Sequence, residues 1–295
     1  MQKGLEDARP KAAAGIALMV AGVACLSAND AFAKTLTADY LPIQILFIRN
    51  LIALPAAALI AWKMGGTAAL RTTRPAAHLV RGTIWIAAAT LFFTSLSYLG
   101  LAEATVLIFA APVFITALSA LVLKEHVGWR RWSAVLVGFL GVLIVVRPGA
   151  STFQAASLLP VLTALLYAVL MISARWVDQR ETVWTLMFYL TAAGTLLSAL
   201  VMPFVWTPLR LEDLWLFVGI AVVGTAGITM MTQAFRFAPA AVVAPFDYTA
   251  LIWATLMGWL FWNEIPDALT WVGAAVIIAS GAFIVWRESR VAKAA

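Results

Sequence analysis

The stretch RWSAVLVGFLGVLIVVR, residues 131–147, decides the fold class of this chain. Between its flanking arginines, residues 132–146 carry no charge. A helix needs about 20 apolar residues to span the hydrocarbon of a bilayer, and this run comes close to that length. The run lacks the strict alternation of apolar and polar side chains that a membrane-spanning strand requires. It therefore predicts a transmembrane helix.

The rest of the chain has the same character. Of its 295 residues, 63% are hydrophobic and only 12% are charged, a balance that would leave a water-soluble domain covered in apolar side chains. Lipid offers no hydrogen-bond partner to the backbone, so such a chain must span as helices or as a closed barrel, and the long runs favour helices. The single cysteine, Cys25, excludes an intrachain disulfide framework and any multi-cysteine metal site. We predict an all-α integral membrane protein.

Ten apolar runs are long enough to serve as spans, and they fall into two groups of five. Short gaps with Gly and Pro separate them, and no gap is long enough for a soluble domain. The first run is too long for a signal-peptide core, so we interpret it as a retained span. The predicted spans are residues 12–33, 41–62, 79–99, 104–123 and 132–146, then 155–174, 183–205, 214–235, 241–262 and 268–286.

The distribution of basic residues predicts the orientation of these spans. With the N-terminus inside, the cytoplasmic segments hold 16 of the 20 Lys and Arg residues, and the outer segments hold only Lys34, Arg147 and Arg210. The remaining one, Arg49, lies inside a span. We predict a multi-pass protein of the bacterial inner (plasma) membrane with both termini in the cytoplasm. The net charge of +6 then reflects orientation, and nucleic acid is not expected as a partner.

The two groups of spans resemble each other in sequence. Glu125 and Glu264 lie 139 positions apart and each follows the last apolar residues of a span, and Trp132 and Trp271, near the start of the next spans, are also 139 apart. A unit of five spans that is repeated once inserts its second copy upside down, as in many secondary transporters. We predict two inverted five-helix repeats around a central cavity, residues 1–149 and 150–295.

These features, with the motif RWx5GFxGVLIVVRPG at 131–149 and the segment FIRN at 47–50, resemble the EamA-type branch of the drug/metabolite transporter superfamily over essentially the whole chain. The resemblance implies ten helices around a cavity that is lined mainly by helices 1, 3, 4, 6, 8 and 9, with helices 5 and 10 at the periphery. It is strongest toward bacterial amino-acid exporters of the inner membrane. Carriers of riboflavin and S-adenosylmethionine share the same fold, so the fold does not fix the substrate.

Ionisable residues inside spans are costly and are candidates for function. Asp30, beside Asn29, and Arg49 lie near enough in depth for a salt bridge, for which we expect a structural or gating role. Asp247, early in the ninth span, has either a direct role toward substrate or protons, or a structural pairing with Arg236, which we weigh as the more frequent case.

Further candidates are aromatic, polar or helix-breaking. His78, Trp85 and Phe92 recur at seven-residue steps on one helix face and suit contacts with an amine-bearing solute, although interfacial anchoring is the commoner role for His and Trp there. Pro112 and Pro245 should kink the fourth and ninth spans. The remaining cavity candidates are Tyr98, Tyr167, Met171, Met230, Gln233, Phe246 and Tyr248.

We therefore predict a secondary transporter that exports small metabolites by alternating access, with amino acids as the first expectation and S-adenosylmethionine or riboflavin as the alternative solutes. An intramembrane enzyme is disfavoured, because His78 and His126 lack metal-ligand spacing and no nucleophile elbow or phosphate loop occurs. No cofactor or metal is expected. The partners are a small solute and membrane lipid, and the chain is a monomer or a weak homodimer. The small-residue pairs Ala134/Gly138 and Ala275/Ala279 suit close helix packing, either within the chain, which is the default in an alanine-rich sequence, or at a dimer interface.

Overall fold

The computed structural model describes residues 2–124, 128–150, 153–173, 177 and 181–292, and within these ranges it contains helices but no strand. Eight helical segments are long and apolar enough to cross a membrane, and Ala268–Ile284 is a shorter apolar helix. The chain is therefore an all-helical, multi-pass membrane protein, as its composition predicts.

The helices follow the predicted spans closely. In the first half they are α1 (Gln2–Leu36), α2 (Pro42–Gly65), α3 (Pro75–Leu96), α4 (Leu101–Ile108), α5 (Ala111–Leu121) and α6 (Trp129–Val146). In the second half they are α7 (Leu158–Ile172), α8 (Val183–Val205), α9 (Leu214–Phe237), α10 (Ala240–Val243), α11 (Ala250–Trp262) and α12 (Ala268–Ala292). Short 3₁₀ helices lie at η1 (Thr67–Leu70), η2 (Ala155–Ser157), η4 (Leu211–Asp213) and η5 (Ala244–Thr249).

Local sequence signals set several of these starts. Pro42 and Pro75 open α2 and α3, where a missing N–H costs nothing because the first helical amides have no intrahelical partner. Thr182 caps α8, because its hydroxyl accepts a hydrogen bond from the backbone N–H of Thr185 at 3.3 Å.

Two predicted spans are broken. The fourth is divided between α4 and α5 at Phe109 and Ala110, immediately before Pro112. In the ninth, α10 is followed by the 3₁₀ helix η5, which contains Pro245 near its start, and only then by α11. Both breaks confirm the kinks expected from the two prolines, which cannot donate a backbone hydrogen bond. Every predicted span overlaps a helix, but the broken ninth is not among the segments that meet the criteria for a membrane crossing.

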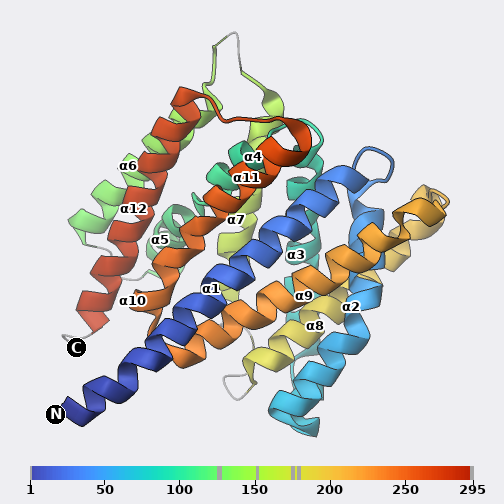
Figure 1. Ribbon diagram of the computed structural model, residues 1–295, viewed down its shortest axis with the longest axis horizontal. Coiled ribbons are helices and arrows are strands. Elements are labelled where there is room, and N and C mark those ends of the chain that lie inside the picture. The colour runs from blue at the N-terminus through green and yellow to red at the C-terminus, as the bar shows by residue number, and fades with distance from the viewer. Residues whose placement is uncertain (1, 125–127, 151–152, 174–176, 178–180, 293–295) are drawn as a thin grey trace.

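The helices pack mainly across the two halves of the chain (Figure 1). α1 packs along α9, α2 along α8, α3 against α7 and α8, and α6 along α12. The α1–α9 crossing is close because glycines meet there: a Cβ on Gly22 would lie 2.9 Å from the carbonyl oxygen of Gly227. Small residues are what allow membrane helices to approach in this way.

The α6–α12 crossing uses some of the small residues that the sequence suggests. Gly138 faces Val113 and Ser280, and the Ser280 hydroxyl donates to the carbonyl of Ala134 at 2.6 Å, so this pair serves internal packing. The second suggested pair, Ala275 and Ala279, is exposed. The face of α12 that packs on α6 instead contains Gly273 and Ile277.

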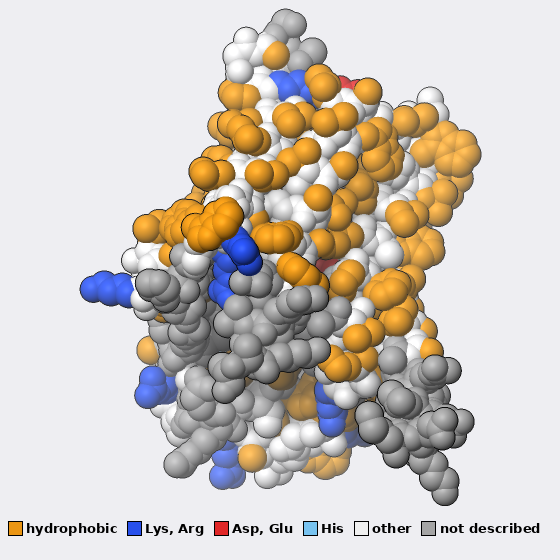
Figure 2. Space-filling model, turned by 90° about the vertical axis from the view of Figure 1, so that its left-hand side faces the viewer, with side chains coloured by type: hydrophobic (Ala, Val, Ile, Leu, Met, Phe, Trp, Pro, Cys, Tyr) orange, Lys and Arg blue, Asp and Glu red, His pale blue; other side chains and the backbone are white. Residues whose placement is uncertain are grey.

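The surface separates into an apolar exterior and two unlike ends. Figure 2 shows apolar side chains over the upper half of the visible face and most of the visible Lys and Arg in its lower half, toward the end where both termini lie in Figure 1. At the opposite end, the three basic residues are paired with carboxylates: Lys34 with Glu264, Arg147 with Asp267, and Arg210 with Asp39.

Candidate functional site

Asp247 lies in the 3₁₀ helix η5, in the break before α11, and so is not part of an α-helix. In a 3₁₀ helix, successive side chains point about 120° apart. Phe246 packs against the cluster between α1 and α9 that contains Met19 and Val23, and Tyr248 packs in another direction, against Phe109. Asp247 between them is exposed.

Asp247 makes no hydrogen bond or ion pair within the described part of the chain. Its expected structural partner, Arg236, lies instead with its Nη1 3.4 Å from the Oε1 of Gln233. The charge of Asp247 acts on the phenols of Tyr167 and Tyr248. Tyr167 belongs to α7, which packs on α3, α4 and α5, whereas η5 packs on α1, α10 and α11. The carboxylate and the Tyr167 phenol therefore approach each other from separate groups of helices.

The two helix breaks meet at an aromatic contact. The ring of Phe109, in the α4–α5 break, packs edge-on against the ring of Tyr248, with centroids 5.0 Å apart. Gly281 on α12 leaves room for the Tyr248 hydroxyl and lies near Pro112. The structure thus brings Pro112, Asp247 and Tyr248 together, three of the candidates that the sequence suggests.

Other predicted cavity residues lie on the helices around this point. Tyr167 and Met171 of α7 are both exposed, as expected for side chains that share a face. Trp85 and Phe92 of α3 are partly buried against the main core. Met230 and Gln233 of α9 are partly buried. Their part in binding remains a prediction.

A second polar layer lies between α1, α2 and α9. Asn29 donates to Asp30 at 3.0 Å, and Arg49, only 7% exposed, interacts electrostatically with Asp30. No direct ion pair joins the described side chains of Asp30 and Arg49. Gly224 of α9 makes the space for this layer, because a Cβ there would lie 2.6 Å from the Asn29 oxygen and 2.8 Å from the Arg49 Nη2. The structural or gating role of these three residues stays a prediction.

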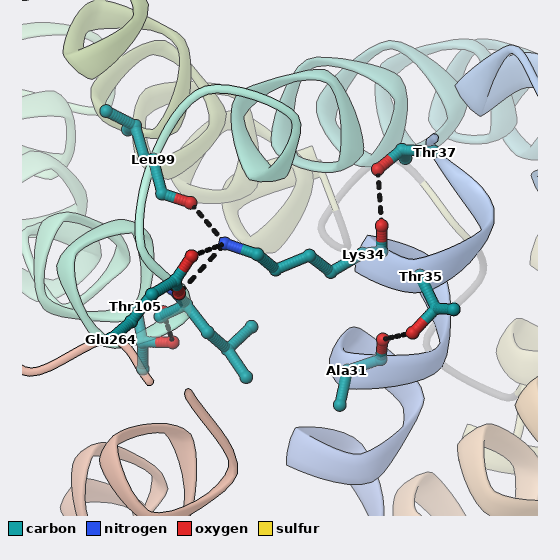
Figure 3. Close-up of polar contacts among 8 residues, drawn as sticks. Ala31, Lys34, Thr35, Thr37, Leu99, Thr105 and Glu264 are labelled. Atoms are coloured by element: carbon teal, nitrogen blue, oxygen red, sulfur yellow. Dashed lines mark hydrogen bonds and ion pairs between the residues drawn. The ribbon is translucent and has the colours of Figure 1, made fainter. Parts of the chain in front are cut away.

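An ion pair at the end opposite the termini joins three parts of the chain (Figure 3). The Lys34 ammonium of α1 donates to both carboxylate oxygens of Glu264, at 2.7 and 2.9 Å, and to the carbonyl of Leu99 at 2.7 Å. Glu264 also accepts the backbone N–H of Leu101 at 3.2 Å. We call this set of contacts the Lys34–Glu264 latch. It holds the α3–α4 turn against α1 and the α11–α12 segment.

His78 lies away from the central residues. Its Nε2 is 2.7 Å from the carboxylate of Glu181, and its ring stacks on Tyr189 with centroids 4.5 Å apart. Glu181 also accepts a hydrogen bond from the Thr72 hydroxyl at 2.5 Å. With 2% exposure, His78 thus joins α3 to the segment before α8.

Tyr98 also lies elsewhere, at the rim of a cavity of about 650 Å³ near the Lys34–Glu264 latch. The same cavity is lined by Glu103, which the sequence analysis did not single out. A carboxylate directly before the fourth predicted span was the available signal. Lys34 and Glu264 were visible in sequence only as an outer basic residue and as part of the repeat, because their contact joins positions 230 apart.

No group of three His, Cys, Asp or Glu side chains that could hold a metal ion occurs in the portion of the chain covered by the structure. The features of the central region are instead one unpaired carboxylate, phenols and aromatic rings beside two helix breaks. Such a set can bind an organic cation through charge and ring contacts.

Comparison with protein families identifies the chain. The model of the EamA-like transporter family matches twice, over residues 13–147 and 154–286. Together the two matches cover almost the whole sequence. The chain belongs to the EamA-like transporter family, and it is a transporter rather than an enzyme.

Relatives of the chain are named for different solutes. The chain is 28% identical to the S-adenosylmethionine uptake transporter of Rickettsia bellii, over 97% of this chain and 98% of the relative. It is 29% identical to the pseudopaline exporter of Pseudomonas aeruginosa, over 90% and 94%, and 29% identical to the riboflavin transporter of Vibrio cholerae, over 77% of each. These relatives support a small-metabolite substrate, and none of them is named as an amino-acid exporter.

A solved crystal structure has the same fold. It superposes with a TM-score of 0.61 at 20% identity and covers 93% of this chain and 98% of its own.

Proposed function

We propose that this protein transports a small organic solute that carries an ammonium or other cationic group, and that Asp247 binds that group. The unpaired state of Asp247 carries the proposal. A charged side chain inside a membrane span is costly unless it has a partner or faces water, and no described residue pairs with this one. A transported cation would supply the missing partner.

The aromatic surroundings fit the same class of solute. The phenols of Tyr167 and Tyr248 lie within electrostatic range of Asp247, and Phe109 contacts Tyr248. Aromatic faces attract organic cations by about 0.5–2 kcal/mol each. Ring contacts would therefore add to the attraction of the carboxylate and favour an organic cation over a hydrated metal ion.

S-adenosylmethionine is our first candidate, because it carries both a sulfonium and an ammonium group and because relatives named for its uptake match nearly the full chain. Amino acids, moved outward, are the second candidate, since every amino acid has an ammonium group that Asp247 would bind in the same way. Riboflavin has no such cation and would depend on ring contacts alone.

We further propose two inverted halves of five crossings, residues 1–149 and 150–295, in the bacterial inner membrane with both termini in the cytoplasm. The two family matches and the distribution of Lys and Arg support this. The helix contacts support it too. In the proposed repeat, α1 corresponds to α7, α3 to α9 and α5 to α11. The contact of α1 with α9 then has its equivalent in that of α7 with α3, and the contact of α5 with α7 has its equivalent in that of α11 with α1.

In this proposal the solute is exposed to the two sides in turn, and the broken helices are the bending points. Each half has one break, and the breaks touch at Phe109 and Tyr248, beside Asp247. The 3₁₀ and proline-interrupted segments lack the full set of α-helical hydrogen bonds, so they bend more easily than the helices around them. Because both breaks lie beside Asp247, bending at either one would change the binding position.

The test is counterflow uptake into liposomes that contain the purified protein and are preloaded with unlabelled solute. The labelled panel is S-adenosylmethionine, riboflavin, lysine and leucine, with protein-free liposomes as the control. We expect the wild-type protein to take up at least one ammonium-bearing solute saturably. Trp85→Ala should take up the same solute more weakly than the wild-type protein. Uptake of riboflavin alone would contradict the proposed role of Asp247.

A further inference from the structure

A second cavity lies at the end opposite the termini, next to the Lys34–Glu264 latch shown in Figure 3. It is bordered by the α3–α4 turn, the C-terminal end of α6, the start of α7 and the α11–α12 segment. Its volume of about 650 Å³ is within the range of small-molecule pockets, roughly 300–1,000 Å³. We call it the latch-side cavity.

The charges around the latch-side cavity do not balance. Lys34 is bonded to Glu264, and Arg147 is bonded to Asp267 at 2.6 Å. These two basic and two acidic side chains are the charged groups that surround Glu103, and each is paired with another member of the set. Glu103 itself makes no hydrogen bond or ion pair with any described residue. The cavity is therefore lined by one carboxylate whose charge is not compensated.

An aromatic ring and neutral polar groups complete the lining. Tyr98 at the rim is 66% exposed, so its ring is free to cover a bound molecule. Gln154, Ser157 and Asn263 supply amide and hydroxyl groups to the wall. A lining with one carboxylate that has no ion-pair partner, one exposed ring and hydrogen-bonding neutral groups suits a small organic body that carries a single positive charge.

We propose that the latch-side cavity is a second solute-binding site, in which Glu103 binds the ammonium group of a small organic amine and Tyr98 packs on its body. The site adjoins the central one. Glu103 and Phe109 are six residues apart, about 9 Å along a helix, and Phe109 contacts Tyr248 beside Asp247. Binding in the latch-side cavity does not depend on the proposed transport function and is measured without transport.

The test uses tyramine, which has one ammonium group and one phenol, and 4-(2-hydroxyethyl)phenol, which has a hydroxyl in place of the amine. Binding to the full-length protein in phosphatidylcholine nanodiscs is measured by calorimetry in the Asp247→Asn background, which lacks the central carboxylate. In that background we compare Glu103→Gln with the matched control Glu212→Gln. Glu212 lies at the same end, with its side chain 74% exposed, and it does not line the cavity.

We expect tyramine to bind in the Asp247→Asn background, the neutral phenol to bind at least 10-fold more weakly, and Glu103→Gln to raise the Kd for tyramine at least 10-fold. Glu212→Gln should leave the Kd unchanged, and thermal melting of each variant verifies that it is folded. Equal binding of both probes, no binding of tyramine, or an unchanged Kd in Glu103→Gln overturns the proposal. If tyramine binds to the wild-type protein but not to Asp247→Asn, the proposal for the latch-side cavity is overturned, whereas the proposal for Asp247 is not.

Discussion

At the scale of single residues, the polar layer of Asn29, Asp30 and Arg49 depends on the absence of a side chain at Gly224. We expect Gly224→Ala to destabilise the protein by about 1–3 kcal/mol, the usual cost of overpacking, because the new methyl group would displace Arg49 or Asn29. Thermal unfolding in detergent measures the change. Gly128→Ala is the control, since a Cβ there meets nothing within 4 Å. Equal melting of the two variants would show that the layer adapts to the methyl group.

The Arg147–Asp267 pair predicts a dependence on pH. Hydrogen bonding from Arg147, with help from Thr270, lowers the pKa of Asp267 from 3.8 to about 2. Because the pKa of Asp267 is lower in the folded state than in the unfolded state, the unfolded chain binds a proton at this carboxylate first as the pH falls. The stabilisation is therefore complete above about pH 4 and is lost as pH falls toward 2. It is small, because the Asp267 side chain is 52% exposed.

Melting curves of the wild-type protein and Asp267→Asn check this dependence. The difference between their melting temperatures should be present at pH 6 and should shrink as the pH approaches 2. A difference that stays constant down to pH 2 would mean that the ion pair contributes nothing through its charge.

At the scale of elements, the Lys34–Glu264 latch joins α1, the α3–α4 turn and the α11–α12 segment. The Lys34 side chain is 9% exposed, so removing the negative charge of Glu264 leaves a nearly buried ammonium group whose other contacts are the Leu99 carbonyl and the Trp262 ring. We expect Glu264→Gln to cost about 2–4 kcal/mol, toward the range for a broken buried pair. The double variant Lys34→Met/Glu264→Gln should lose less than the sum of the two single variants.

A double-mutant cycle measured by thermal unfolding gives this coupling. The same cycle on Arg147 and Asp267 is the comparison. It should give a smaller coupling energy, because the Asp267 side chain is half-exposed. Additive effects at Lys34 and Glu264 would show that the latch does not hold the three elements together.

Elements were also where sequence reasoning was most successful. The prolines at 112 and 245 predicted both helix breaks, because a proline removes a backbone donor wherever it stands. Internal packing by Ala275 and Ala279 was wrong, since small residues in an alanine-rich helix occur on every face and only the neighbouring helix decides which face packs. A dimer interface at these two residues stays a prediction. The latch was not predicted, because it depends on how distant turns are brought together.

At the scale of the whole molecule, composition and hydrophobic runs predicted an all-helical membrane protein, and the family match confirms the resemblance read from residues 131–149. The candidate site was only partly predictable. Asp247 stood out as a charge within a span, but its lack of a partner depends on how the two halves meet. His78 shared a helical face with Trp85, yet Glu181, a residue far away in sequence, determines its contacts.

The proposed orientation predicts a labelling pattern. In a Cys25→Ser background, a cysteine at Glu212→Cys should react with a membrane-impermeant maleimide in intact cells, because that position lies at the end opposite the termini. A cysteine at Lys63→Cys, at the end of α2 nearer the termini, should react only after lysis. The reverse pattern would invert the topology, and labelling of both positions in intact cells would contradict the predicted crossings between them.

The most direct test of the central claim is S-adenosylmethionine counterflow by Asp247→Asn, compared with wild-type protein reconstituted in parallel. The asparagine keeps the shape of the side chain and removes its charge. We predict that uptake at low solute concentration falls at least 10-fold, because the ammonium or sulfonium group loses its carboxylate partner, about 1.4 kcal/mol for each factor of ten. Uptake by Asp247→Asn equal to that of the wild-type protein would contradict the account.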